Sequence, residues 1–399
     1  MEWKEVTLGE ISSKIGDGLH GTPKYDDEGP YYFINGNNLN CGKIIIKDDT
    51  KRVGKDEFVK NQKELNEQTI LVSINGTIGN VAKYNNELCI LGKSACYINV
   101  IKEVDKEFIY YVLTSANFKR NITNEATGTT IKNVSLKQMR EYKFNIPCNI
   151  SDQRRIASIL SSLDRKIELN NKINADLEEM AQAIFKNWFV DFEPFKDGKF
   201  VDSELGMIPE GWKVGTLKDL LYLRKDSIKA ANKGNLPYLP IDTIPMHCLV
   251  ATDFKSNDEA KSSLQTFEQN DIVVGAMRVY FHRVILAPCK GITRTTCFVL
   301  SVKNENALAY SLMQCNQDEA ISFAEKTSKG STMPYAVWDG GYGEYKVVIP
   351  PSEVMKSFND LLSNFFSKMN KNAIENSRLS LLRDTLLPRL MSGELEVPE

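Results

Sequence analysis

Polar and apolar residues alternate with a helical period along two long segments of the chain. In residues 151–189 a seam follows steps of three and four residues, at positions 156, 160, 163, 167, 170, 174, 177, 181, 184 and 188. This spacing is typical of the a and d positions of a coiled coil. A second segment, residues 352–387, has the same pattern. We expect Ser151 or Asp152 to cap the first helix, Ser352 to cap the second, and Pro388 and Gly393 to stop the second.

The two helical segments match each other when one is shifted by 202 residues, a shift that brings Leu160 onto Leu362. Asparagines interrupt both seams at the same two positions, namely Asn170 and Asn174 in the first helix and Asn372 and Asn376 in the second. Polar seam residues cost stability but fix register and partner. Antiparallel pairing sets Asn170 opposite Asn376. The only unfavourable layer in this pairing sets Leu163 against Arg383. A parallel pair also aligns the asparagines, and packing of each helix on its own domain is the third alternative.

Strand patterns also occur twice. Residues 68–100 and 270–302 each contain three β-branched runs joined by short turns, and residues 127–147 and 329–350 each contain a Gly-Ser/Thr-Thr loop, a Tyr-Lys strand and Ile-Pro. The chain opens with "MEWKEVTLGEI" and later repeats this opening as "GWKVGTLKDL". We therefore predict a mixed α/β (α+β) fold with two similar strand-rich globular domains. Two long antiparallel coiled-coil helices separate the domains, and a pseudo-two-fold axis relates the halves.

The predicted boundaries follow from these patterns. They are 1–150 for the first domain, 151–190 for the first long helix, 191–211 for a linker, 212–351 for the second domain, 352–392 for the second long helix and 393–399 for a tail.

Composition narrows the class of protein. The eight cysteines are scattered singly, which speaks against a structural zinc site and a disulfide framework. No apolar run approaches the roughly 20 residues that cross a bilayer, and the start does not resemble a signal peptide. We expect a soluble cytoplasmic protein with no membrane partner.

The sequence shows no recognisable motif of a catalytic or cofactor-binding site. "LGKSAC" at 91–96 resembles the end of a phosphate-binding loop, but Glu87 stands where the first glycine is required. "IPPS" at 349–352 is not the motif of amino-methyltransferases. His20, His247 and His282 have no local partner pattern, so we expect no catalytic residue and no metal site. A catalytic site assembled from distant residues is the alternative.

Two duplicated units on a rigid spacer suit a duplicated ligand, and DNA half-sites repeat with the helical pitch. Net charge is only −2, but residues 126–140 and 272–303 contain no Asp or Glu. These acid-free runs are compatible with DNA contact. The plainer interpretation is a few charge-poor strands with solvated tips.

Several stretches together resemble one family. The central region, "SDQRRIASILSSLDRKIELNNKINADLEEMAQAIFKNWFVDFEPF", closely resembles the specificity (S) subunit of type I restriction–modification systems. So do "GDGLHGTP" (16–23), "VSINGTIGN" (72–80), "TGTTIKNVS" (127–135) and "LLRDTLLPRLMSGEL" (381–395). The resemblance covers essentially the whole chain, and the Trp-Phe-x-Asp-Phe-x-Pro stretch at 188–194 is its most specific part.

The resemblance implies a non-enzymatic DNA-specificity subunit. Each of two target recognition domains would read one half of a bipartite, asymmetric site in double-stranded DNA. The helices would set the spacer and dock two modification (methyltransferase) subunits, and restriction (endonuclease/translocase) subunits would join for cleavage. No cofactor is expected in this chain, since AdoMet and ATP would belong to the partner subunits. The rival hypothesis is a coiled-coil scaffold with two ligand-binding domains and no DNA recognition.

Residue types select the candidate DNA contacts, because phosphates are bound by Lys, Arg and hydroxyls, and base edges by Arg, Asn and hydroxyls. In the first half the candidates are His20, Thr22, Lys24, Asn75, Thr77, Lys93, Ser94, Thr129, Thr130 and Lys132. In the second half they are Arg278, Tyr280, Arg294, Lys329, Ser331 and Thr332. The second half lacks the His-x-Thr-Pro of the first, and Arg278 and Tyr280 stand in "AMRVYF" where the first half has "NGTIG". This divergence suits two domains that read different half-sites.

An aromatic group follows the first long helix. Trp188, Phe189 and Phe192 are candidates for docking a modification subunit, and with Phe195 they could alternatively form a local hydrophobic plug.

Overall fold

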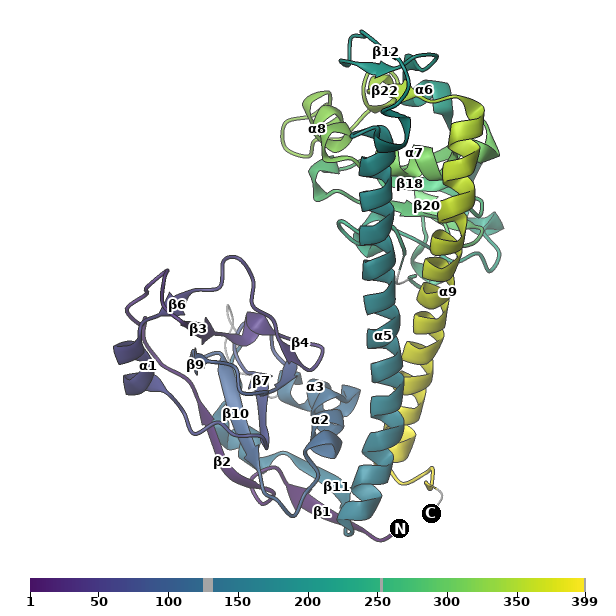
Figure 1. Ribbon diagram of the computed structural model, residues 1–399. Coiled ribbons are helices and arrows are strands. Elements are labelled where there is room, and N and C mark those ends of the chain that lie inside the picture. Colours follow the sequence, from purple (N-terminus) through teal and green to yellow (C-terminus); the bar gives the residue numbers. More distant parts are fainter. Residues whose placement is uncertain (125–131, 252–253, 398–399) are drawn as a thin grey trace. The chain divides into compact units, whose positions relative to one another are not determined.

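The computed structural model describes residues 1–124, 132–251 and 254–397 (Figure 1). The chain divides into two compact units. Unit 1 comprises Met1–Arg165 and Leu381–Glu399, and unit 2 comprises Lys166–Ser380. Each unit therefore contains part of both long helices. No helix in the described ranges has the length and apolarity needed to cross a membrane.

Unit 1 combines strands with short helices. Its strands are β1 (Trp3–Thr7), β2 (Ser12–Asp17), β3 (Tyr31–Ile34), β4 (Leu39–Asn40), β5 (Lys43–Ile44), β6 (Arg52–Val53), β7 (Thr69–Ser73), β8 (Val81–Lys83), β9 (Cys89–Leu91), β10 (Ala95–Val100) and β11 (Lys143–Pro147). Its short helices are α1 (Lys55–Asn61), α2 (Lys106–Thr114), α3 (Ala116–Asn124) and α4 (Leu136–Glu141).

Unit 2 has the same kinds of element. Its strands are β12 (Phe200–Val201), β13 (Ile208–Pro209), β14 (Lys213–Thr216), β15 (Leu221–Leu223), β16 (Ser227–Ile228), β17 (Leu264–Phe267), β18 (Ile272–Gly275), β19 (Val284–Leu286), β20 (Gly291–Arg294), β21 (Cys297–Val302) and β22 (Lys346–Ile349). Its short helices are α6 (Leu217–Leu220), α7 (Leu308–Cys315) and α8 (Asp318–Lys326). The mixed α/β class predicted from the sequence is confirmed.

The same sheet topology appears in both units. The four-stranded sheet of unit 1 has the order β2-β10-β7-β8, and that of unit 2 has the order β15-β21-β18-β19, with antiparallel neighbours in both. In each unit the first strand pairs with the strand that precedes a long helix, β1 with β11 and β14 with β22. A shift of 202 residues takes β10 onto β21 and α3 onto α8. The repeated sequence therefore folds into repeated elements.

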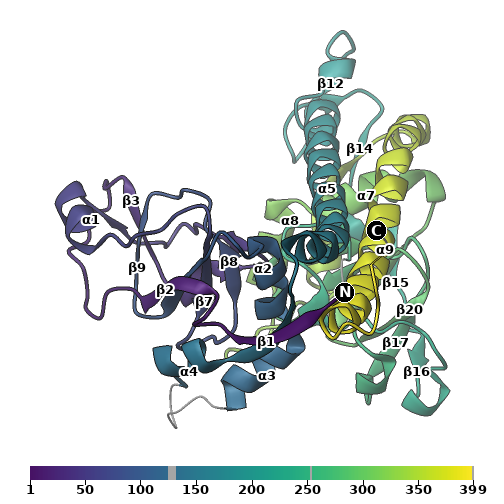
Figure 2. The ribbon, with the colours of Figure 1, turned by 90° about the horizontal axis from the view of Figure 1, so that it is seen from below.

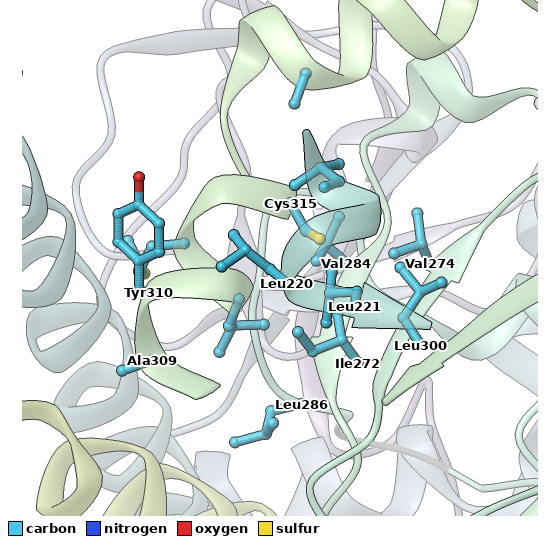
Figure 3. Close-up of a cluster of buried hydrophobic side chains, with 14 of the residues drawn as sticks. Leu220, Leu221, Ile272, Val274, Val284, Leu286, Leu300, Ala309, Tyr310 and Cys315 are labelled. Carbon is cyan, nitrogen blue, oxygen red and sulfur yellow. The ribbon is translucent and has the colours of Figure 1, made fainter. Parts of the chain in front are cut away.

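The two sheets are held by separate apolar cores. In unit 1, α2 and α3 bury Phe108, Leu113 and Phe118 against β2, β7 and β10. In unit 2, α7 contributes Ala309, Tyr310 and Cys315 to a cluster with Leu220, Leu221, Ile272, Val274, Val284, Leu286 and Leu300 from α6, β15, β18, β19 and β21 (Figure 3). Burial of such large apolar side chains is the main favourable term for each unit.

The long helices are α5 (Ile150–Phe189) and α9 (Ser352–Met391). The ends of both helices lie within one residue of the predicted ranges 151–190 and 352–392. Of the two predicted stop signals, Pro388 does not end α9, which continues for three further residues. Proline removes only one intrahelical hydrogen bond near this end. Leu387 and Leu390 are buried in the core of unit 1, and their burial keeps the last turn helical. The chain then turns at Gly393, whose φ is +75°.

Each opening tryptophan is packed by the segment that follows a long helix. In unit 1, a Cβ at Gly393 would lie 2.8 Å from Nε1 of Trp3, so only glycine fits beneath that ring. In unit 2, the ring of Trp212 lies 4.9 Å from that of Phe195 and 5.6 Å from that of Phe192. The tail of α9 thus closes unit 1, and the tail of α5 closes unit 2.

Candidate nucleic-acid interface

Four segments gather at one end of the four-stranded sheet of unit 1. Loop 18–24 follows β2, loop 74–80 follows β7, turn 92–94 joins β9 to β10, and segment 132–134 precedes α4. Backbone hydrogen bonds join them in series, from Leu19 N to Leu91 O (2.7 Å), from Ile74 N to Ser94 O (3.0 Å) and from Val134 N to Ile74 O (2.9 Å). We call this end of unit 1 the first reading edge. Its members are far apart in the sequence, and the antiparallel sheet brings them together.

Most candidates from the first half lie exposed on the first reading edge. These are His20, Thr22, Lys24, Thr77, Lys93 and Lys132. His20 is already engaged, since its Nε2 lies 2.7 Å from Oδ2 of Asp17. Asn75 is half-buried and bridges to Asn133. Thr129 and Thr130 lie outside the described residues.

Ser94 has a structural use at this edge. Its hydroxyl donates to Oδ1 of Asn35 (3.0 Å) and accepts from the backbone N–H of Gly36 (2.8 Å). These bonds tie the turn before β10 to the chain after β3. The side chain is half-buried. It therefore positions the edge and has little capacity left for a ligand.

Unit 2 repeats the first reading edge with the same hydrogen bonds. Shifted by 202 residues, the bond from Ile74 N to Ser94 O becomes one from Ala276 N to Thr296 O (2.9 Å). The bond from Val134 N to Ile74 O becomes one from Ala336 N to Ala276 O (2.8 Å). The isolated bridge between Asn75 and Asn133 becomes one between Met277 and Tyr335. We call this end of unit 2, formed by residues 276–283, 294–296 and 328–336, the second reading edge.

Every candidate from the second half lies exposed on the second reading edge, namely Arg278, Tyr280, Arg294, Lys329, Ser331 and Thr332. Arg278 has a left-handed backbone, with φ +51°, and its N–H donates to Pro334 O at 2.8 Å. Within the described ranges, no salt bridge occupies Arg278, Arg294 or Lys329. Their charges are therefore free for a polyanion.

A pocket of about 490 Å³ opens beside Arg294 on the second reading edge. Sequence reasoning missed most of its lining, which includes Tyr238, Asp242, Lys255, Met277 and Met333. A hydrogen bond from Lys255 holds the pKa of the Asp242 carboxyl below its usual value. The edge thus offers apolar and aromatic surface beside its cations. Tyr335 and Met333 are also exposed. No pattern in the sequence distinguished these two residues from other loop residues.

Buried asparagines join α5 and α9 within unit 2, where both views show the helices side by side (Figures 1 and 2). Asn170 Nδ2 donates to Asn376 Oδ1 at 2.9 Å, and Asn372 Nδ2 donates to Asn174 Oδ1 at 2.9 Å. One residue number rises as its partner's falls, so the helices are antiparallel. A second bond from Asn170 Nδ2 reaches Glu375 Oε2 at 2.8 Å and holds the pKa of that carboxyl below its usual value.

The sequence sets Leu163 against Arg383 in one layer of the seam, and in the structure a carboxylate pairs with that arginine. Arg383 Nη1 donates to Asp164 Oδ1 at 2.8 Å, and Tyr111 OH donates to Asp164 Oδ2 at 2.7 Å. Asp164 therefore links α5, α9 and α2 within unit 1. A charged residue beside the seam is tolerated because it is paired.

The aromatic candidates after α5 are largely used inside unit 2. Phe189 is 6% exposed and packs against Tyr310 and Phe358. Trp188 and Phe192 are half-buried against the same core. Phe189 has almost no surface to offer a partner, and the hydrophobic-plug alternative describes its position. Any docking surface here would consist of the exposed parts of Trp188 and Phe192.

Comparisons with known proteins agree on one family. Residues 1–179 match the family model described as type I restriction modification DNA specificity domain. The MjaIX specificity subunit of a type I restriction enzyme from Methanocaldococcus jannaschii is 27% identical over 95% of this chain and 87% of that protein. The HindI specificity subunit from Haemophilus influenzae is 23% identical over 99% of this chain and 100% of that protein.

A solved structure shares the fold. The type I restriction–modification S subunit from M. genitalium superposes with a TM-score of 0.59 at 19% identity, covering 98% of this chain and 96% of that one. At this identity the likeness establishes the fold alone. The matched domain and the relatives that span nearly the whole chain point to one family: the chain is similar to the type I restriction–modification specificity subunits.

Proposed function

We propose that this chain is the DNA-sequence-specificity subunit of a type I restriction–modification complex and performs no chemistry itself. Each reading edge contacts one half of a bipartite, asymmetric site in double-stranded DNA. The observation that carries the proposal is the repetition of the same hydrogen-bonded edge in both units at a shift of 202 residues, from Ile74 to Ala276. A frame that is kept while its exposed side chains differ is suited to two half-sites of different sequence.

The residue types at the edges support direct readout. Arginine can bond bidentately to guanine, and asparagine can bond to adenine. Arg278 and Arg294 offer the first kind of group in unit 2, and Asn75 offers the second in unit 1. The exposed Lys93, Lys132 and Lys329 suit phosphate contacts, which fix orientation on the duplex. The two units would then prefer different bases.

The long helices support a role as spacer and dock. Two antiparallel helices with paired asparagines have a fixed register, so they can hold two DNA-reading domains at a set separation about a pseudo-two-fold axis. We propose that two modification (methyltransferase) subunits dock on the helices, one for each unit, and that restriction subunits join for cleavage. AdoMet and ATP would be bound by those partners. The exposed faces of Leu169, Met180, Leu361 and Leu381 offer apolar surface for such docking.

A gel-shift assay tests the proposal with the full chain and its modification subunits. Random duplexes are selected on the complex and sequenced. We expect a site with two short specific blocks and a spacer of fixed length. Binding that ignores sequence, or that ignores the spacer, would reject the proposed function.

The competing function is a coiled-coil scaffold whose two units bind other ligands. It predicts that DNA affinity and its dependence on salt are unchanged when the edge cations are removed. We expect the opposite. Combining Lys132→Ala with Lys329→Ala should weaken binding and lower the salt slope by about two, because each lysine neutralises about one phosphate.

A further inference from the structure

Three potential metal ligands converge beside the second reading edge. His247 lies in the loop between β16 and β17, His282 lies in the loop between β18 and β19, and Asp318 is the first residue of α8. Their ligand atoms all lie within 4.8 Å of one another. No sequence motif signals this group, because its members are spread over residues 247–318. Only the folding of unit 2 brings them together.

The hydrogen bonds of His282 determine how its ring is used. Its Nε2 lies 3.1 Å from the backbone O of Asn316 and 3.0 Å from Oδ1 of the same residue. The backbone oxygen can only accept, so Nε2 carries a proton and donates it. In a neutral imidazole the other nitrogen, Nδ1, then presents a lone pair. That nitrogen lies 3.1 Å from Oδ1 of Asp318, which is a second acceptor.

Two acceptors face each other across this short distance, and a cation is needed between them. Either a second proton on His282 or a metal ion would satisfy both the imidazole nitrogen and the carboxylate oxygen. The position of His247 favours the metal ion. Its ring centroid lies 4.5 Å from that of His282, and a further imidazole adds a lone pair but no negative charge. A protonated His282 would gain nothing from that neighbour.

We propose that His247, His282 and Asp318 bind one divalent transition-metal ion, with Zn²⁺ as the best match. Two imidazole nitrogens and one carboxylate oxygen are a usual zinc ligand set, whereas Mg²⁺ and Ca²⁺ prefer oxygen ligands alone. A nitrogen and an oxygen bound to the same tetrahedral zinc ion lie about 3.3 Å apart, close to the observed separation of His282 and Asp318. Asn316 supplies the outer hydrogen bond that orients a zinc-ligating histidine.

Burial differs among the ligands in a way that suits an accessible site. The side chain of His282 is 6% exposed, that of Asp318 is 84% exposed, and His247 is also exposed. The buried ligand is therefore held in place, and the other two close over the ion from solvent. The backbone reinforces this arrangement, since His247 N donates to His282 O at 2.9 Å.

The site would stiffen the second reading edge. His282 lies in the same short loop as Arg278 and Tyr280, and the ion would tie this loop to α8 and to the loop that carries His247. This consequence rests on the proposed function, whereas metal binding itself does not. Unit 1 has no matching set, because Asn80 and Ala116 stand 202 residues before His282 and Asp318. The ion would therefore distinguish one unit from the other.

Metal binding is tested on the full chain without DNA. The protein is stripped with a chelator, and Zn²⁺ is titrated in competition with a chromophoric indicator. We expect one tight equivalent, and we expect His282→Asn, His247→Gln and Asp318→Asn each to weaken it by about tenfold or more. Circular dichroism and thermal unfolding establish that each variant is folded.

His20→Gln is the matched control, because His20 also pairs with a carboxylate, Asp17, but has no third ligand. It should leave the tight equivalent intact. Substitution with Co²⁺ should give the visible spectrum of a nitrogen–oxygen site. Absence of a tight equivalent, its survival in the triple variant, or a sulfur-to-cobalt charge-transfer band would each overturn the proposal.

A separate assay keeps this inference distinct from the proposed function. Zinc removal should loosen selection of the half-site read by unit 2 and leave the other half-site unchanged. If the chain binds zinc but selects no DNA sequence, the proposed function fails while the metal site stands. If the chain selects a DNA sequence but binds no zinc, the metal site fails while the proposed function stands.

Discussion

At the scale of single residues, Arg278 is the sharpest test of base recognition. It is exposed, its backbone is held in a left-handed conformation, and no ion pair in the described ranges occupies its guanidinium. We expect Arg278→Ala to cost about 1–3 kcal/mol of binding to the preferred site and much less on random DNA, because a bidentate contact to guanine would be lost. Competition gel-shifts measure both.

Lys213→Ala is the matched control for Arg278, since Lys213 is an exposed cation on β14, outside the second reading edge. Lys213→Ala should change neither the affinity for the preferred site nor the affinity for random DNA. Equal losses on preferred and random DNA for Arg278→Ala would assign Arg278 to a phosphate instead of a base.

Glu178 carries the clearest pH dependence. Burial raises the pKa of its carboxyl above the ordinary value of 4.5, and a bond from the Leu249 N–H (3.2 Å) opposes this only in part. A carboxyl whose pKa is raised by folding holds its proton more tightly in the folded state. The free energy of unfolding therefore falls as pH rises from about 4.5 through the folded pKa. It stays reduced at higher pH.

Glu178→Gln removes that penalty. We expect the variant to unfold at higher urea concentration at pH 8, with a gain of roughly 1 kcal/mol, and to differ little from the parent below pH 4.5. Glu179→Gln, on the exposed side of the same turn, should change stability at neither pH. A gain that is equal at both pH values would contradict the assigned cause.

At the scale of elements, the paired asparagines decide how α5 meets α9. Asn372→Leu alone leaves the buried Asn174 amide without the partner at 2.9 Å, and we expect it to cost about 1–3 kcal/mol. The double variant Asn174→Leu/Asn372→Leu forms an apolar layer and should recover most of that loss. A double-mutant cycle by chemical unfolding measures the coupling. Additive effects would show that the two amides are energetically independent.

The long helices and their register were within reach of sequence reasoning, because seam periodicity and matched asparagines are local signals. The passage of α9 through Pro388 was not, since burial of Leu387 and Leu390 outweighs the local preference of Pro388. Candidates such as Arg278 and Lys132 were found from loop chemistry. Their neighbours Tyr238 and Met333, and the group around His282, depend on tertiary packing, which leaves no spacing to detect. The DNA contacts themselves stay predictions.

At the scale of the whole molecule, the proposed spacer formed by α5 and α9 can be shortened without breaking the seam. Removing residues 165–171 from α5 and 375–381 from α9 deletes one heptad from each helix in opposing layers. The pair Asn174 and Asn372 is kept, and the a/d pattern continues across both joins. Seven residues shorten a helix by about 10.5 Å. Successive base pairs are 3.4 Å apart along the DNA axis, so the preferred spacer should shrink by about three base pairs.

The two half-site sequences should stay the same in this variant, because neither reading edge is touched. Removing the heptad from α5 alone is the matched control, since it shifts the register and should impair assembly instead of giving a new spacer. Selection of binding sites from random duplexes measures both outcomes. An unchanged spacer in the double deletion would mean that the partner subunits, and not α5 and α9, set the distance between the half-sites.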